Sequence, residues 1–235
     1  MATYVIVHGA WGGSAGWTPT AERLRAAGHA VYTPTLTGLG QRKHLFSGAI
    51  NLSTHVQDVA GVIESENLRD FVLVGHSYGG MVITGVADRF ADRIRQLVYL
   101  DAFLPDDGTS AFDFIGREGT LHNIAGAGAH GGGVGVPPPD LSVFNVPSAQ
   151  RALMQSTLSP QPIGTLIEKL KLTGAADRIP KRLYVWCSGY SPSIFTKAYE
   201  RVKNDPKWQT EVMACGHVMM VDMPDRTFEI LAGVA

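Results

Sequence analysis

The chain has 235 residues, a formal net charge of −1 and a hydrophobic fraction of 45%. This length suits one α/β domain with a large core, and the near-neutral charge gives no long-range field to attract nucleic acid or an anionic membrane. No apolar run approaches the ~18 residues that a bilayer span requires. We therefore expect neither nucleic acid nor a membrane among the partners.

The first third of the chain alternates between strand and helix patterns. The β-rich residues 3–7 end at a glycine-rich loop, His8-Gly9-Ala10-Trp11-Gly12-Gly13. The pattern then predicts a helix that Ser14 caps and Gly28 ends, a strand over 30–33, and a helix from Asn51 or Ser53 to about 63. Because the chain moves directly into its first strand, we expect no signal peptide and a cytoplasmic location.

The stretch over residues 71–80 carries the strongest signal. Four apolar residues, 71–74, predict a buried parallel strand, and Gly75-His76-Ser77-Tyr78-Gly79 matches the G-x-S-x-G nucleophile elbow. Such an elbow holds its serine on a tight strand-to-helix turn, where side chains at positions 75 and 79 would clash. We therefore predict that Ser77 is a nucleophile exposed above the sheet.

The rest of the chain completes the predicted architecture. A helix over 81–90 and a strand over 94–100 make four alternations, which favours a mostly parallel, doubly wound sheet with reactive groups at the carboxyl ends of its strands. Residues 126–139 are rich in glycine and proline and predict no regular element, with helical signals beside them at 148–158 and 162–171. We interpret residues 105–179 as a lid inserted into a single domain over 1–235. The alternation then resumes with predicted strands over 182–187 and 209–214 and a closing helix over 222–231.

A serine nucleophile needs a base and a site for the oxyanion. His217 follows the last predicted strand behind Gly216, which leaves room for its imidazole to reach the elbow. His76, inside the elbow, points the wrong way to be the base and is expected to pack or hydrogen-bond. The backbone amides of Tyr78 and Ala10 are the expected oxyanion donors.

These motifs together identify a family. The combination of His8-Gly9-Ala10-Trp11, the elbow and Gly216-His217 resembles the α/β-hydrolase superfamily. Residues 33–40 and 99–105 resemble the bacterial carboxylesterases of the small branch that also contains plant methyl-salicylate-type esterases and hydroxynitrile lyases. The resemblance implies an α/β-hydrolase fold and ester hydrolysis through an acyl-serine, with Ala10 and Tyr78 forming the oxyanion hole.

One part departs from the family pattern. The acid usually follows the penultimate strand, but here that strand leads into Cys187-Ser188-Gly189-Tyr190-Ser191-Pro192, and no Asp or Glu occurs before Glu200. We predict instead that Asp101, at the end of the strand after the elbow helix, accepts the imidazole N–H. Ser188 or Ser191 as a weaker polar orienter is the alternative.

The expected substrate is a small ester with a hydrophobic part. Trp11, Phe103, Leu104 and Phe144 are the predicted substrate-binding residues, and several further apolar side chains could line the same pocket: Phe112, Phe114, Ile115 and Leu158. Amides, thioesters or lactones would use the same machinery. We expect no metal and no cofactor, because no histidine pair has metal-ligand spacing beside a carboxylate.

Two other functions compete with the esterase. A hydroxynitrile lyase of this branch carries a lysine after the triad histidine to hold cyanide, whereas this chain has Val218 there. A ligand-binding homologue without turnover is the second alternative, since the position of the acid is unusual.

Cys187 and Cys215 are expected to be buried free thiols, and a disulfide is possible only if the two strand ends are neighbours. The chain could form a homodimer.

Overall fold

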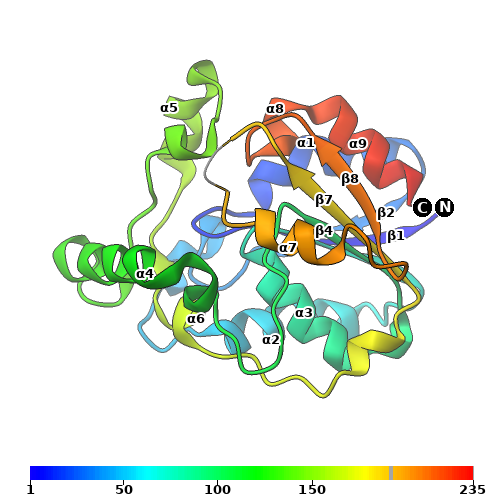
Figure 1. Ribbon diagram of the computed structural model, residues 1–235, viewed down its shortest axis with the longest axis horizontal. Helices are drawn as coiled ribbons and strands as arrows, with labels where there is room; N and C mark the ends of the chain where they lie inside the picture. The colour runs from blue at the N-terminus through cyan, green and yellow to red at the C-terminus, as the bar shows by residue number, and fades with distance from the viewer. Residues whose placement is uncertain (191–192, 235) are drawn as a thin grey trace.

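A six-stranded sheet with the order β2-β1-β3-β4-β7-β8 runs through the middle of the molecule (Figure 1). The structure is a computed structural model, which describes residues 1–190 and 193–234. Every neighbouring pair of strands in this sheet is parallel. The strands are β1 (Thr3–Val7), β2 (Ala30–Tyr32), β3 (Phe71–His76), β4 (Ile94–Leu100), β7 (Lys181–Cys187) and β8 (Gln209–Met213). The predicted parallel α/β fold is confirmed.

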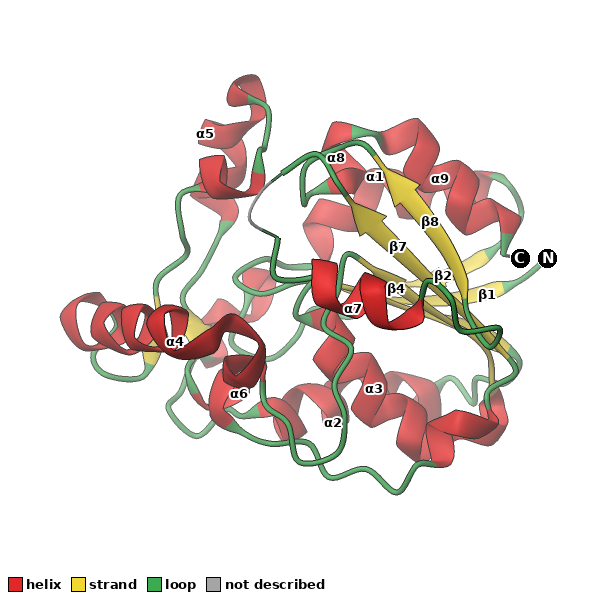
Figure 2. Ribbon diagram, viewed as in Figure 1, coloured by secondary structure: helices red, strands yellow, loops and turns green. Residues whose placement is uncertain are grey.

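Helices cover both faces of the sheet (Figure 2). One face packs against α1 (Thr18–Ala26), α8 (Met219–Asp222) and α9 (Pro224–Gly233), and the other against α2 (Leu52–Ser65), α3 (Gly79–Phe90) and α7 (Thr196–Val202). The apolar side chains form a separate buried cluster on each face. Strand β3 is buried at every position because both of its faces are covered, which is why it reads as a continuous apolar run.

The start of each early helix depends on a local signal. Asn51 caps α2 as predicted: its side-chain oxygen accepts the Thr54 N–H at 2.9 Å, and the Thr54 hydroxyl accepts the Asn51 N–H at 3.3 Å. Ser14 was wrongly predicted as a cap. A 3-10 turn over Ser14–Trp17 comes first, and α1 begins only at Thr18, where Pro19 occupies the first turn.

Residues 105–179, which we call the lid segment, lie between β4 and β7 in the chain. They contain α4 (Ala111–His130), β5 (Gly135–Val136), α5 (Ser148–Thr157), β6 (Gln161–Pro162) and α6 (Gly164–Ile167). In Figure 1, α4 and α5 stand beyond the carboxyl ends of the strands. None of the helices in the described residues combines the length and the apolar surface that a bilayer crossing requires.

The start of the glycine-rich stretch differs from the prediction. Residues 126–139 were expected to form no regular element, but α4 continues to His130. Alanines between the glycines retain helix propensity, and the helix ends when the N–H groups of Gly131 and Gly133 both reach the Ala127 carbonyl, at 3.0 and 2.9 Å. The helical prediction over 162–171 was too long, because only Gly164–Ile167 is helical.

Candidate active site

Three predicted site residues follow three strands of the sheet. Ser77 comes directly after β3, Asp101 directly after β4, and His217 lies in the loop between β8 and α8. Their exposed fractions are 9%, 0% and 3%. Because the strands are parallel, their carboxyl ends meet at one edge of the sheet, and the fold brings the three side chains to that edge.

The turn that carries Ser77 has no room for side chains beside it. A Cβ added at Gly79 would lie 2.6 Å from the Val7 carbonyl oxygen, and one at Gly75 would lie 2.8 Å from that of Gly79. The φ of Ser77 itself is 55°, in the left-handed region that non-glycine residues rarely adopt. The expected strained elbow is therefore present, and tight packing holds it.

Asp101 and His217 form a short hydrogen bond. The His217 Nδ1–H donates to Asp101 Oδ2 at 2.6 Å, and the fully buried carboxylate also accepts the Cys187 N–H at 3.2 Å through Oδ1. Asp101 has a φ of 43°, a second strained backbone position in the site. With Nδ1 bound to a carboxylate, the unprotonated Nε2 of His217 is the nitrogen that can take a proton.

Aromatic rings surround the imidazole of His217. Phe195 stacks on it with ring centroids 5.0 Å apart, Phe144 lies at 4.8 Å and His76 at 4.6 Å. His76 donates its Nε2–H to the His217 carbonyl at 3.0 Å, and burial holds the pKa of His76 well below its ordinary value. His76 therefore packs and hydrogen-bonds, as expected, and supports the loop that carries His217.

The two predicted oxyanion donors lie beside the serine. A Cβ added at Gly9 would be 2.9 Å from the Ser77 Cβ, so the loop with Ala10 runs directly against the elbow. In the part of the chain that the structure describes, the backbone N–H groups of Ala10 and Tyr78 have no hydrogen-bond partner. The Tyr78 hydroxyl donates to His55 Nδ1 at 3.0 Å, which anchors the side chain behind its free amide.

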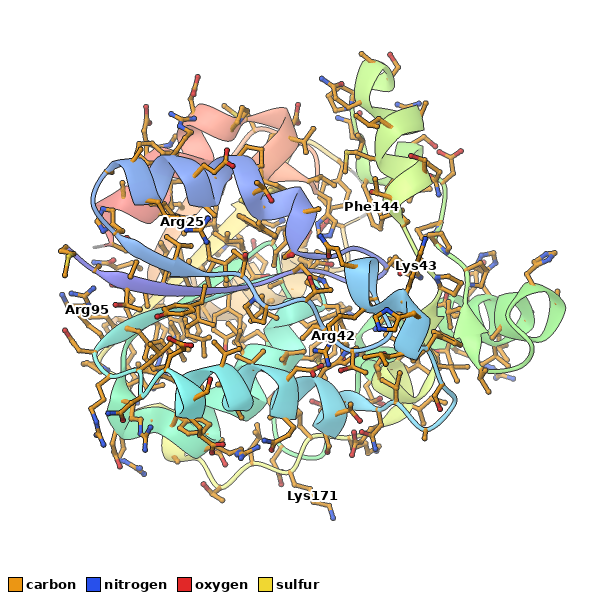
Figure 3. The ribbon with its side chains drawn as sticks, turned by 180° about the vertical axis from the view of Figure 1, so that it is seen from behind. Arg25, Arg42, Lys43, Arg95, Phe144 and Lys171 are labelled. Carbon is orange, nitrogen blue, oxygen red and sulfur yellow. The ribbon has the colours of Figure 1, made fainter. Side chains whose placement is uncertain are left out.

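A cavity of about 460 Å³ opens above Ser77 and His217. Trp11 and Phe144 line it as predicted, and so does Leu158; Lys43 and Phe144, both labelled in Figure 3, belong to its wall. Most of the other apolar lining residues were not predicted from the sequence: Trp17, Leu141, Met154, Val218, Met220 and Val221. They come from three separate segments, so no local pattern groups them.

Two predicted substrate-binding residues do not line this cavity. Phe103 and Leu104 are 6% exposed and belong to the core, because the chain after Asp101 turns back under the elbow. The Phe103 N–H donates to the Ser77 carbonyl at 3.1 Å, and the Phe103 ring packs against Phe114. Phe112, Phe114 and Ile115 likewise pack against the core and are absent from the cavity wall.

The loop after β7 supplies a residue that the sequence analysis missed. Tyr190 donates its hydroxyl to Asp101 Oδ2 at 2.7 Å and lies 3.3 Å from His217 Nδ1. Ser188, one of the alternative orienters, donates instead to the Met213 carbonyl at 3.3 Å. Ser191, the other, lies outside the described residues. The sequence signal that could have identified this residue is a tyrosine three positions after the end of the strand.

The two cysteines lie side by side beneath the site. Cys187 ends β7 and Cys215 lies two residues after the neighbouring β8; both are buried free thiols, and their Sγ atoms are 3.6 Å apart. The hydrogen bond with Cys215, followed by burial, raises the pKa of the Cys187 thiol far above its ordinary value. Among the described residues, no three His, Cys, Asp or Glu side chains are grouped so that they could hold a metal ion.

Comparisons with known proteins agree with this geometry. The model of the alpha/beta hydrolase family matches residues 4–230. The chain is 44% identical to the carbendazim hydrolyzing esterase of a Nocardioides species over the full length of both proteins. It is 25% identical to the putative chloroplastic methylesterase 14 of Arabidopsis thaliana, over 99% of this chain and 71% of that protein.

A solved structure extends the likeness to three dimensions. An extracellular alpha/beta-hydrolase from a Paenibacillus species, described as sharing structural and functional homology with tobacco Salicylic Acid Binding Protein 2, superposes with a TM-score of 0.85. The two chains are 27% identical, and the match covers 99% of this chain and 98% of the other.

Proposed function

Because this chain belongs to the alpha/beta hydrolase family, we propose that it is a serine carboxylesterase that hydrolyses small, partly hydrophobic esters through an acyl-serine. One observation carries the proposal. A strained serine and a histidine line the same cavity, and that histidine is tied at 2.6 Å to a buried carboxylate. This is the arrangement that activates a hydroxyl for attack on a carbonyl carbon.

In the first step Ser77 Oγ forms a bond to the ester carbonyl carbon. His217 Nε2 takes the serine proton, and Asp101 stabilises the imidazolium through the Nδ1–H hydrogen bond. The carbonyl π electrons move to the oxygen, which the free N–H groups of Ala10 and Tyr78 receive. The N-terminus of α3, which starts at Gly79, adds its positive dipole end beneath the serine.

The tetrahedral intermediate then collapses and expels the alcohol. His217 returns its proton to the leaving oxygen, and the C–O bond of the ester breaks to leave an acyl-Ser77. Water enters, loses a proton to His217 and attacks the acyl carbon. The bond between this carbon and Ser77 Oγ then breaks, His217 returns the proton to Oγ, and the acid is released. Asp101 keeps the same contact throughout and does not itself take the proton.

The cavity wall favours neutral, apolar substrates. Apart from histidines, Lys43 is the only ionisable side chain on the described wall of the cavity, and it is exposed. A charged substrate would therefore lose hydration without gaining a buried partner. The 44% identical relative is named for hydrolysis of carbendazim, so we include this compound among the expected substrates. The cytoplasmic location and a homodimer stay predictions.

The lyase alternative is weaker at this site. Val218, directly after His217, lines the cavity where a lyase of this branch would need a lysine. An apolar side chain cannot stabilise a departing cyanide ion.

The proposal is tested with p-nitrophenyl esters of increasing acyl length, together with carbendazim. We expect rates to fall once the acyl chain outgrows the cavity of about 460 Å³. Ser77→Ala should lose about 10⁴-fold or more in kcat. Ser188→Ala is the matched control, because the hydroxyl of this exposed serine binds only the Met213 carbonyl among the residues that the structure describes. Hydrolysis that survives Ser77→Ala would contradict the proposal.

A further inference from the structure

The loop after β7 carries no carboxylate in its described residues, yet it reaches the centre of the site. We propose that Tyr190 is a positioning residue of the esterase reaction, whose hydroxyl fixes the Asp101 carboxylate against the imidazole of His217. The inference rests on the proposed function for its kinetic consequence. The structural claim is that the Tyr190 hydroxyl governs the hydrogen bond between Asp101 and His217. This claim rests on the contacts in the structure and does not need the proposed function.

Tyr190 contacts both members of the pair. Its hydroxyl is 2.7 Å from Asp101 Oδ2 and 3.3 Å from His217 Nδ1. Asp101 Oδ2 also accepts the His217 Nδ1–H at 2.6 Å, so one carboxylate oxygen receives two donors. The phenol therefore determines both where this oxygen lies and how much of its electron density remains for the imidazole.

A second hydroxyl orients the phenol. Ser193 Oγ donates to the Tyr190 oxygen at 3.0 Å and accepts the Phe195 N–H at 3.2 Å. Hydrogen bonds thus run from the Phe195 backbone through Ser193 and Tyr190 to Asp101. The ring of Phe195 stacks on His217 with an interplanar angle of 11°. The same loop therefore contacts Asp101 through the Tyr190 hydroxyl and His217 through the ring of Phe195.

The direction of donation is defined by the surroundings. Burial, followed by the negative charge of Asp101, raises the pKa of the Tyr190 phenol well above its ordinary value. The phenol therefore keeps its proton and can only donate to the carboxylate. With the Ser193 hydroxyl occupying the phenolic oxygen, the Tyr190 proton points towards Asp101.

Tyr190→Phe separates this role from packing. The ring contributes to the core beside the site, and phenylalanine keeps that ring while it removes the hydroxyl. Without its second donor, Asp101 Oδ2 becomes a stronger acceptor for His217 and is held less firmly in place. The first change favours the imidazolium, and the second slows proton transfer from the serine.

Other ionisable groups near His217 stay unchanged in this variant. They belong to five elements of the described chain or to the loops that follow them: Asp101 after β4, His76 at the end of β3, Cys187 at the end of β7, Cys215 after β8 and Asp222 in α8. Asp222 accepts the Gly216 N–H at 2.7 Å, one residue before His217. A shift in the pH profile of Tyr190→Phe therefore reports the lost hydroxyl.

The kinetic test uses the wild-type enzyme and Tyr190→Phe with p-nitrophenyl butyrate across pH. We expect kcat to fall about tenfold with KM changed less than about twofold, because the contact acts on Asp101 rather than on substrate. The acid limb of the kcat/KM profile should move up by about half a unit to one unit. Ser193→Ala should move both quantities in the same direction by less.

The matched control is Tyr199→Phe. Tyr199 stacks on Trp186 at 4.8 Å, and its hydroxyl has no hydrogen-bond partner among the described residues. This variant removes the same atom from the next tyrosine along the chain. We expect its kcat and its pH profile to match those of the wild-type enzyme.

A second readout does not depend on turnover. The proton in the Asp101–His217 hydrogen bond should give a far-downfield ¹H NMR resonance, and Tyr190→Phe should move it further downfield. Wild-type values of kcat, acid limb and resonance in Tyr190→Phe would overturn the proposal. If the wild-type enzyme shows no hydrolysis that depends on Ser77, the proposed function fails. The resonance still decides the role of Tyr190: a shift supports it, and no shift overturns it.

Discussion

The loops at the carboxyl ends of the strands and the lid segment above them are held in place in different ways. Asp101 and His217 are buried and hydrogen-bonded to each other, and the tight turn of the elbow leaves no room for a side chain at Gly75 or Gly79. In contrast, α4 buries only Ala111 and Ala127 among its 20 residues, and α5 buries none. The sheet therefore positions Ser77, Asp101 and His217, whereas the lid segment supplies part of the cavity wall.

The lid segment meets the site at a few defined contacts. The Phe144 carbonyl accepts the His217 N–H at 2.9 Å, and Asn145 Nδ2 donates to the Gly189 carbonyl at 3.0 Å. The buried Gln161 accepts the Trp11 N–H at 2.9 Å. The comparison predicts that changes beneath the strand ends affect kcat or stability, and that changes in the lid segment mainly affect KM.

Asp101→Asn should have the largest effect. Asparagine keeps the shape but can present its amide N–H to His217 and favour the wrong tautomer, so kcat should fall about 10³- to 10⁴-fold. Asp88→Asn is the control, because Asp88 lies at the opposite end of α3 from Ser77 and accepts the Thr173 and Ala175 N–H groups at 2.8 and 2.9 Å. Near-normal turnover of Asp101→Asn in steady-state assays would remove Asp101 from the mechanism.

Low pH should destabilise the region beneath the catalytic loops. Burial lowers the pKa of His8 and that of His55 to about 4, while an unfolded histidine titrates at about 6.5. Between these two pKa values the unfolded chain binds more protons than the folded protein. The stability that depends on the two neutral histidines is therefore fully present above pH 6.5 and falls as the pH drops towards 4. From pH 7 to pH 5, each histidine should cost about 2 kcal/mol of the free energy of unfolding.

Urea unfolding at the two pH values measures this loss. His55→Gln cannot gain the charge and should reduce the difference between pH 7 and pH 5 by about a third, because burial also lowers the pKa values of His8 and His76. His122→Gln, at an exposed position of α4, should leave it unchanged. Equal stability of the wild-type protein at both pH values would show that the buried histidines do not resist protonation.

Two neighbouring residues of α5 test whether the lid segment mainly affects KM. Met154 lines the cavity, whereas Leu153 is 73% exposed. Met154→Ala should raise KM for a butyrate ester about three- to tenfold with little change in kcat, because it removes apolar contact with the substrate. Leu153→Ala should stay within about twofold of the wild-type protein in both constants. A fall in kcat for Met154→Ala would mean that the lid segment also positions the reacting groups.

The sequence predicted those features that depend on local pattern. The run over 71–80 contains the strand, the glycines and the serine of the elbow, so β3 and its turn could be predicted from it alone. The position of Asp101 near Ser77 could be predicted because the strand ends of a parallel sheet meet at one edge. The contact between Asp101 and His217 follows from this topology rather than from their separation of 116 residues along the chain.

The features of the site that could not be predicted depend on the path that the chain takes after a strand. Nothing in the order Asp101-Ala102-Phe103-Leu104 indicates that the chain turns back under α3, which places Phe103 in the core rather than in the cavity. Tyr190 was missed for the same reason, because its partner belongs to another strand. The end of α4 was missed because glycine content outweighed the alanines between the glycines.

The most direct test of the central claim is to map the site of a fluorophosphonate label by peptide mass spectrometry. The account predicts one phosphonyl group on Ser77 of the wild-type protein, and strongly reduced labelling in His217→Ala and in Asp101→Asn at the same pH. A label on another residue, or an active enzyme that does not react, would contradict it.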